Sequence, residues 1–179
     1  MDSRQVARCG VAVALLAVSA CVTLPLGPVP FTLQTLVVAM LPVALGGRDA
    51  LLAVACYLAL GSLGMPVFSG LSGGAAHVLG PTGGYLWGFL VGTAMAGAVG
   101  RAGLLPQVAR DYLGAALSLL TVYAVGTAQL CLVMGISPAA ALLIAVAPFV
   151  GPDATKLLIG VAAGRRVRAA LGMWAAPHA

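Results

Sequence analysis

The sequence predicts an all-α, polytopic membrane protein with six transmembrane helices in a single domain, residues 1–179. Of the 179 residues, 61% are hydrophobic and only 7% are charged, so the chain cannot cover a soluble surface with polar groups. The apolar runs lack the alternation of polar residues that the strands of a membrane barrel show. The arginines occur only at alternate connections between the runs, as expected for an even number of crossings.

The first predicted helix covers residues 6–24 and follows Arg4 and Arg8. Such a run also fits a cleavable signal sequence, and residues 18–21 (VSAC) resemble a lipoprotein cleavage box. We interpret it as a membrane helix, because the rest of the chain is too apolar for an aqueous compartment. Residues 24–30 contain three prolines and therefore form a stiff, non-helical link.

Two shorter helices are predicted next, residues 31–46 and 49–63, with a turn over residues 46–49. Each is roughly 22 Å long at ~1.5 Å per residue, against ~30 Å of hydrocarbon, so length alone does not ensure that each one spans. Residues 64–82 are rich in Gly and Ser, and their apolar content argues against disorder. We predict that they form an external lid or a partly inserted loop.

The fourth predicted helix, residues 83–100, carries a small residue at every fourth position. Such a stripe allows another helix to approach closely, and we expect it to pack inside the bundle; self-association through the same stripe is the alternative. The fifth helix covers residues 111–134 and the sixth covers residues 139–164. The sixth is interrupted by proline, at Pro148 and Pro152.

The eight arginines predict the orientation of these helices. They lie at the N-terminus, in the second and fourth connections and after the sixth helix: Arg4, Arg8, Arg48, Arg101, Arg110, Arg165, Arg166 and Arg168. By the positive-inside rule both termini are cytoplasmic, which predicts a multi-pass protein of the inner (cytoplasmic) cell membrane with the lid outside.

Asp153 and Lys156 are the only ionised side chains in the apolar run of residues 139–163, and Lys156 is the only lysine. Three residues apart on a helix, they can reach each other. Because each charge would cost at least ~2.5–3.5 kcal/mol at mid-depth, they predict a functional site in the outer half of the membrane. Lys156 can hold a carboxylate and Asp153 can accept N–H groups; a structural ion pair is the alternative.

Other polar side chains are candidate ligand contacts, each with a simpler alternative. Gln34 lies inside the second helix, where a helix–helix hydrogen bond would also explain it. His77 lies in the lid, where a solvated histidine is common. Thr82 and Tyr85 lie where the fourth helix begins, and Tyr85 also fits an anchor at the membrane interface.

Several classes of function lack the residues that they need. The chain has no glutamate, no GxSxG, HExxH or phosphate-loop motif, and only two histidines, His77 and His178. The four cysteines have no CxxC spacing, so we expect no metal and no cofactor. The net charge of +5 follows from topology rather than from nucleic-acid binding. A binding or transport protein is therefore favoured over an enzyme, with a membrane-embedded enzyme that uses Asp153 as a base on a lipid-like substrate as the alternative.

Four motifs together resemble the BioY family, the biotin-specific S components of energy-coupling factor (ECF) transporters. These are VPFTLQTL at 29–36, GMPVF at 64–68, GPTGGYLWG at 80–88 and DxxK at 153–156, and the similarity extends over about residues 6–165. The resemblance implies a six-helix protein that captures biotin from outside, with Asp153 and Lys156 as biotin contacts. It also implies that Gly83 and Gly84 in the third motif are substrate contacts. This chain has Gly151-Pro152 where the family typically has Pro-Gly.

The resemblance also implies partners. Family members work with a transmembrane coupling subunit and cytoplasmic ABC-type ATPases, in a bilayer of membrane lipid, and are thought to tilt to release substrate inward. Docking on the coupling subunit uses small residues four apart in the first helix, for which Gly10 and Ala14 are the nearest match here. A stand-alone facilitator of biotin or another small carboxylate, without an ATPase, is the alternative.

Overall fold

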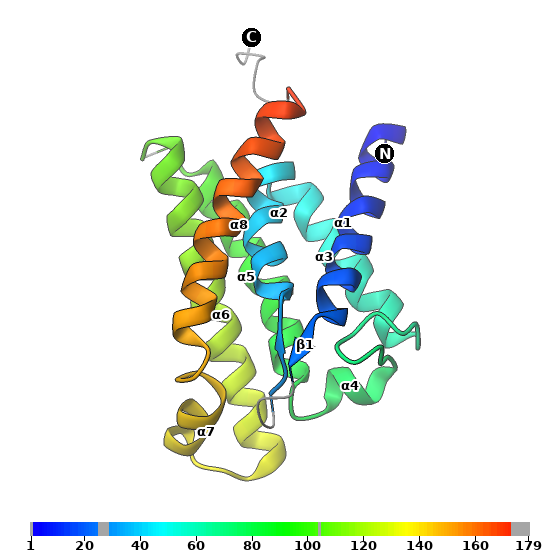
Figure 1. Ribbon diagram of the computed structural model, residues 1–179, viewed down its shortest axis with the longest axis vertical. Helices are drawn as coiled ribbons and strands as arrows, with labels where there is room; N and C mark the ends of the chain where they lie inside the picture. Colours follow the sequence, from blue (N-terminus) through cyan, green and yellow to red (C-terminus); the bar gives the residue numbers. More distant parts are fainter. Residues whose placement is uncertain (1, 25–28, 104, 173–179) are drawn as a thin grey trace.

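The computed structural model describes residues 2–24, 29–103 and 105–172, which contain eight helices and a two-stranded hairpin (Figure 1). In chain order they are α1 (Ser3–Cys21), β1 (Thr23–Leu24), β2 (Phe31–Thr32), α2 (Gln34–Leu45), α3 (Gly47–Ser62), α4 (Ala75–Leu79), α5 (Gly83–Arg101), α6 (Gln107–Met134), α7 (Pro138–Ala145) and α8 (Val150–Ala170).

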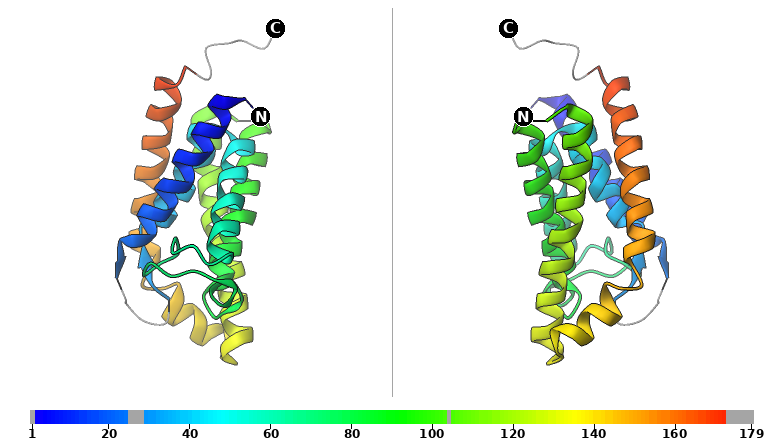
Figure 2. Two further views of the ribbon diagram at one scale, coloured as in Figure 1. Left: turned by 90° about the vertical axis from the view of Figure 1, so that its right-hand side faces the viewer. Right: turned by 90° about the vertical axis from the view of Figure 1, so that its left-hand side faces the viewer.

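The long helices run in alternating directions, so that α1 begins and α8 ends at the same end of the bundle (Figures 1 and 2). The junctions α2–α3 and α5–α6 lie at this end too, and α4 and α7 lie at the other. Among the described helices, α1 and α6 are long and apolar enough to cross a membrane, and the bent pair α7–α8 also passes this test when the two helices are counted as one span. Six crossings and cytoplasmic termini stay predictions.

The hairpin corrects the prediction of a purely α-helical chain. Thr23 pairs with Thr32 and Leu24 with Phe31, so the first helix ends at Cys21 and the second begins only at Gln34. The Thr32 hydroxyl accepts a hydrogen bond from the Gln34 backbone N–H at 3.3 Å, at the point where the strand ends and α2 begins. Residues 25–28 of the predicted stiff link lie outside the described residues.

The predicted turn at residues 46–49 is reduced to Gly46, whose φ of 85° places it in a left-handed region that favours glycine. Helix α3 already begins at Gly47, which packs on α5: a Cβ there would lie 2.5 Å from the Gly97 Cα atom. The connection after α5 is also shorter than predicted, because α6 begins at Gln107.

The lid, residues 64–82, was expected to contain no helix but includes α4, which carries His77. Phe68 is buried on Gly61 of α3, and the Tyr57 hydroxyl donates to the Val67 carbonyl at 2.9 Å. The Gln129 side-chain amide, on α6, donates to the carbonyls of Val78 at 3.1 Å and of residue 80 at 2.7 Å. The lid is therefore held by α3 on one side and by α6 on the other.

Besides α3 and α5, glycines bring two further pairs of helices into backbone contact. On α5, a Cβ at Gly88 would lie 2.7 Å from the Val122 Cα atom of α6, and Gly84 and Gly92 are equally close to that helix. On α8, a Cβ at Gly160 would lie 2.5 Å from the Leu36 carbonyl oxygen of α2. The stripe on the fourth predicted helix therefore serves packing inside the bundle, as expected; self-association stays untested.

The last segment is interrupted at one of the two predicted prolines, whereas Pro152 lies in the first turn of α8 and does not break it. Helices α7 and α8 are bent by 59° at a break that contains Pro148, and Asp153 lies in the first turn of α8. The predicted end at residue 164 is wrong, because α8 continues to Ala170. Arg165 and Arg168 lie on this extension, and both contact the Asp111 carboxylate of α6.

Candidate substrate-binding site

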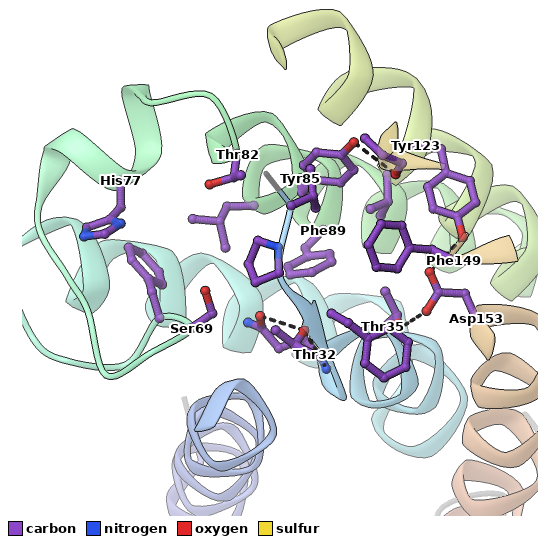
Figure 3. A pocket seen from close by; sticks show the side chains of 18 of the residues that line it. Thr32, Thr35, Ser69, His77, Thr82, Tyr85, Phe89, Tyr123, Phe149 and Asp153 are labelled. Atoms are coloured by element: carbon purple, nitrogen blue, oxygen red, sulfur yellow. Dashed lines mark hydrogen bonds between the residues drawn. The ribbon is translucent and has the colours of Figure 1, made fainter. Parts of the chain in front are cut away.

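A cavity of about 720 Å³, counted to its open mouth, lies between the hairpin, the lid and the ends of α2, α5, α6, α7 and α8 (Figure 3). The wall is mostly apolar and aromatic, with a few polar groups. It consists of Val29, Pro30, Phe31, Thr32, Gln34, Thr35, Phe68, Ser69, Ser72, His77, Thr82, Tyr85, Leu86, Phe89, Val122, Tyr123, Ala145, Phe149, Asp153 and Lys156.

Asp153 is buried in this wall, and donors from three helices fix its carboxylate. The Lys156 ammonium donates to Oδ1 at 2.8 Å and the Thr35 hydroxyl to the same oxygen at 2.9 Å. The Tyr123 hydroxyl donates to Oδ2 at 2.7 Å (Figure 3). The break before α8 places Asp153 in the first turn, where the helix dipole also favours an anion.

Lys156 is as buried as its partner, with 6% of its surface exposed. Its ammonium donates to the Thr32 carbonyl of the hairpin at 2.7 Å and lies 3.5 Å from the centroid of the Phe31 ring. Phe31 stacks on Phe149, with ring centroids 6.0 Å apart. The predicted ion pair is therefore formed, and it joins α8 to the hairpin through Lys156.

Gln34 both lines the cavity and joins two helices. Its side-chain amide donates to the Tyr57 hydroxyl of α3 at 2.7 Å, and its carbonyl accepts from the Thr32 hydroxyl at 3.2 Å. Because Tyr57 in turn donates to the lid at Val67, one chain of hydrogen bonds connects the hairpin, α2, α3 and the lid.

Of the remaining residues predicted to contact the ligand, some line the cavity and others pack against neighbouring backbone. His77 and Thr82 line the end of the cavity opposite Asp153, and Tyr85 lies between them and Tyr123 (Figure 3). The Tyr85 hydroxyl donates to the Ala145 carbonyl at 3.4 Å, next to the break between α7 and α8. Gly83 and Gly84 are placed differently: a Cβ on Gly83 would overlap the Val78 carbonyl, and Gly84 faces the α6 backbone.

Sequence reasoning missed Thr35, Tyr123 and the aromatic wall formed by Phe31, Phe89 and Phe149. Tyr123 lies 30 positions from the carboxylate that it contacts, and Thr35 lies 118 positions away. The sequence does show a polar residue within each of these apolar helices. It does not show that both hydroxyls contact Asp153, because that depends on how the helices pack.

The predicted docking residues Gly10 and Ala14 lie on an exposed face of α1. A Cβ at Gly10 would have no atom within 4 Å, and Val6, Val11 and Val18 are exposed on the same helix. Within the described residues, no group of three or more His, Cys, Asp or Glu side chains is placed to hold a metal ion. His178 lies outside the described residues.

The arrangement suits recognition of a small molecule with an apolar body and polar ends. Aromatic rings provide the broad surfaces of the wall, while the Asp153–Lys156 pair offers one acceptor and one donor at one end. Ser69, His77 and Thr82 provide further polar groups at the other end (Figure 3).

Comparisons with known proteins identify relatives along the whole chain. The sequence model of the BioY family matches residues 1–173. A probable biotin transporter BioY of Pyrococcus horikoshii is 37% identical over 168 residues, 94% of this chain and 98% of that protein. The biotin transporter BioY of Rhizobium etli is 34% identical over 78% of both chains, and that of Thermotoga maritima is 48% identical over 52% of this chain and 56% of its own.

The fold agrees with this relationship. A crystal structure of the S component for biotin from an ECF-type ABC transporter superposes with a TM-score of 0.85 at 25% identity, over 94% of this chain and 95% of that one. The apolar helices and the shared fold mark an integral membrane protein of a transport family rather than a catalytic one. The chain belongs to the BioY family.

Proposed function

We propose that this protein is the substrate-capture subunit of a vitamin uptake transporter. It binds biotin from outside the cell and delivers it inward with an ATP-driven module, made of a transmembrane coupling subunit and cytoplasmic ABC-type ATPases. The buried Asp153–Lys156 pair, placed in the wall of an aromatic cavity, is the observation that supports this most directly. Membership of the BioY family supports the choice of biotin.

Biotin has the chemistry that this cavity would complement. Its carboxylate suits the ammonium of Lys156, and its two ureido N–H groups need acceptors such as Asp153, Ser69 or Ser72. Asp153 already accepts three hydrogen bonds of roughly four that a carboxylate can take, so at most about one remains for a ligand. The rings of Phe31, Phe89 and Phe149 would contact the fused rings and the aliphatic chain.

The proposal includes an orientation. The chain crosses the inner membrane six times with both termini in the cytoplasm, so the cavity lies in the outer half beneath the external lid. Asp153 precedes Arg165 by 12 residues, or roughly 18 Å along a helix, which agrees with this depth. Gly10 and Ala14 would then face the coupling subunit from α1.

A calorimetric titration of the purified protein tests the proposal, with biotin compared with other water-soluble vitamins. We expect binding near one to one for biotin and at least a hundredfold weaker binding for the others. Absence of biotin binding by folded protein would overturn it. Uptake into vesicles with this chain alone, and with the ATP-driven module added, separates the proposal from a stand-alone facilitator, which would need no module.

A further inference from the structure

A second cavity, of about 890 Å³ when counted to its open mouth, lies at the end of the bundle where α1 begins and α8 ends. Helices α2, α3, α5, α6 and α8 all contribute to it, and none of its residues lines the substrate cavity. Its lining is Ala39, Pro42, Val43, Leu45, Gly46, Gly47, Arg48, Asp49, Ala96, Gly97, Gly100, Arg101, Gln107, Arg110, Asp111, Gly114, Ala115 and Arg168.

Among the described residues, the lining carries more arginines than carboxylates. Asp111 is occupied by Arg168 at 2.6 Å and Arg165 at 3.3 Å, and it also accepts from the Gln107 amide. Four arginines and two aspartates line the cavity. Within the described ranges, no carboxylate oxygen lies within 4.0 Å of Arg48, Arg101 or Arg110, although all three line it.

At Arg110, one side-chain donor lacks a hydrogen-bond acceptor among the described residues. Its two terminal nitrogens donate to the Gly100 carbonyl and to the Gln107 side chain, each at 2.7 Å. Its Nε–H is buried and has no acceptor in the part of the chain that the structure describes. A buried donor without a partner is destabilising, so an acceptor supplied from outside the chain would stabilise the protein.

The start of α3 adds donors to the same place. Gly46 and Gly47 line the cavity, so the N–H groups of the first turn and the helix dipole are close to it. Asp49 lies in the same turn, and its carboxylate accepts a hydrogen bond from the Gln5 side-chain amide at 2.6 Å. A Cβ at Gly47 would lie 3.4 Å from Arg101 Nη1, which places that guanidinium beside this helix start. Ala39, Val43, Ala96 and Ala115 make the rest of the wall apolar.

We propose that this cavity binds the phosphate group of an anionic phospholipid from the cytoplasmic leaflet. Unpaired guanidinium groups and a helix start recognise phosphate, and the apolar wall suits the glycerol and upper acyl carbons attached to it. Basic pockets between membrane helices on the cytoplasmic side are a known form of lipid recognition. The proposal rests on the orientation given above but not on biotin as the substrate.

Native mass spectrometry of the full chain, released from nanodiscs of phosphatidylglycerol and phosphatidylcholine in equal parts, tests this site. We expect the wild-type protein to retain phosphatidylglycerol preferentially. Arg101→Gln and Arg110→Gln should each reduce that retention at least tenfold. Arg166→Gln is the matched control, because Arg166 is exposed on α8 and does not line the cavity; its retention should equal that of wild type.

Equal retention in all three variants, or no preference for the anionic lipid, would overturn the proposal. So would equal thermal stabilisation by inorganic phosphate and by phosphatidylglycerol, which would indicate a site for free anions. Loss of coupling-subunit binding in Arg101→Gln with unchanged lipid retention would assign the cavity to a protein partner and likewise overturn it. Biotin titrations of the same variants should match wild type, so failure of this site and failure of biotin binding are distinguishable.

Discussion

Lys156 has three N–H donors, and the protein itself satisfies most of them. One reaches the Thr32 carbonyl, one reaches Asp153, and the Phe31 ring covers the ammonium. A buried ion pair with this many partners also fits a purely structural role. What favours binding is its place in a cavity wall beneath a lid.

We expect Tyr123 to position this pair, because its hydroxyl donates to the Asp153 oxygen that Lys156 does not contact. We expect Tyr123→Phe to weaken biotin binding by about tenfold, or ~1.4 kcal/mol, since a hydrogen bond to a charged group contributes ~1.5–3 kcal/mol. Calorimetric titration measures the change.

Tyr112→Phe is the control for Tyr123. It lies on the same helix, and among described residues its hydroxyl has no hydrogen-bond partner. Its affinity for biotin should equal that of wild type. If Tyr123→Phe also binds as tightly as wild type, Tyr123 does not position the site.

At the residue scale, the sequence identifies charges better than their partners. Asp153 and Lys156 stand out because nothing else in their run is charged, and their spacing already implies contact. Tyr123 and Thr35 do not stand out, because a hydroxyl in an apolar helix can bond to its own backbone, as Thr121 does with the Leu117 carbonyl. Only the packing of three helices brings both hydroxyls to one carboxylate.

Two glycine-packed helix pairs, α5 with α6 and α2 with α8, form the walls on either side of the substrate cavity. We expect Gly88→Ala to destabilise the protein by about 1–3 kcal/mol, because its Cβ would overlap the Val122 backbone. Thermal unfolding in detergent measures this.

Gly100→Ala is the matched control on the same helix, with nothing within 4 Å of the added Cβ. It should leave stability unchanged or raise it slightly, since alanine favours helix over glycine by up to ~1 kcal/mol. Equal unfolding midpoints for the two variants would contradict the packing role of the stripe.

The lid is the second element with a testable attachment. Gln129→Ala removes both hydrogen bonds from α6 to the carbonyls around α4. We expect biotin to dissociate several-fold faster, because the lid opens more often. Stopped-flow displacement of a fluorescent biotin analogue measures the rate. Thr121→Val is the control, because the Thr121 hydroxyl bonds to the Leu117 carbonyl and the Met95 sulfur and not to the lid. An unchanged rate would show that these bonds do not hold the lid closed.

At the element scale, the sequence predicts helix boundaries correctly where a proline prevents a helix from continuing or a glycine permits a turn. Pro148 lies in the break before α8, and Gly46 separates α2 from α3. The hairpin and α4 were missed because strands of two residues and a helix of five are shorter than any periodic pattern. Helix α8 was predicted too short because three arginines resemble a helix end, whereas Asp111 of α6 pairs with two of them.

The whole molecule has one arginine-bearing end and one end that carries the lid. In a variant without native cysteines, we expect Leu79→Cys on α4 to react with a membrane-impermeant maleimide in intact cells, because that position is exposed. Arg166→Cys should react only after the membrane is permeabilised. The reverse pattern would contradict the proposed orientation, and with it the outward-facing cavity and the cytoplasmic lipid site.

The central claim is that the Asp153–Lys156 pair is present to bind the substrate rather than to hold the fold. A single substitution would leave one charge buried without its partner, which destabilises a protein by ~3–5 kcal/mol. The decisive variant is therefore the double substitution Asp153→Asn with Lys156→Met. It removes both charges and nearly keeps the side-chain volume. Its biotin affinity, measured by calorimetric titration beside its thermal unfolding, tests the claim most directly. The account predicts a protein as stable as wild type that binds biotin at least tenfold more weakly; a stable double variant that binds biotin with wild-type affinity would contradict it.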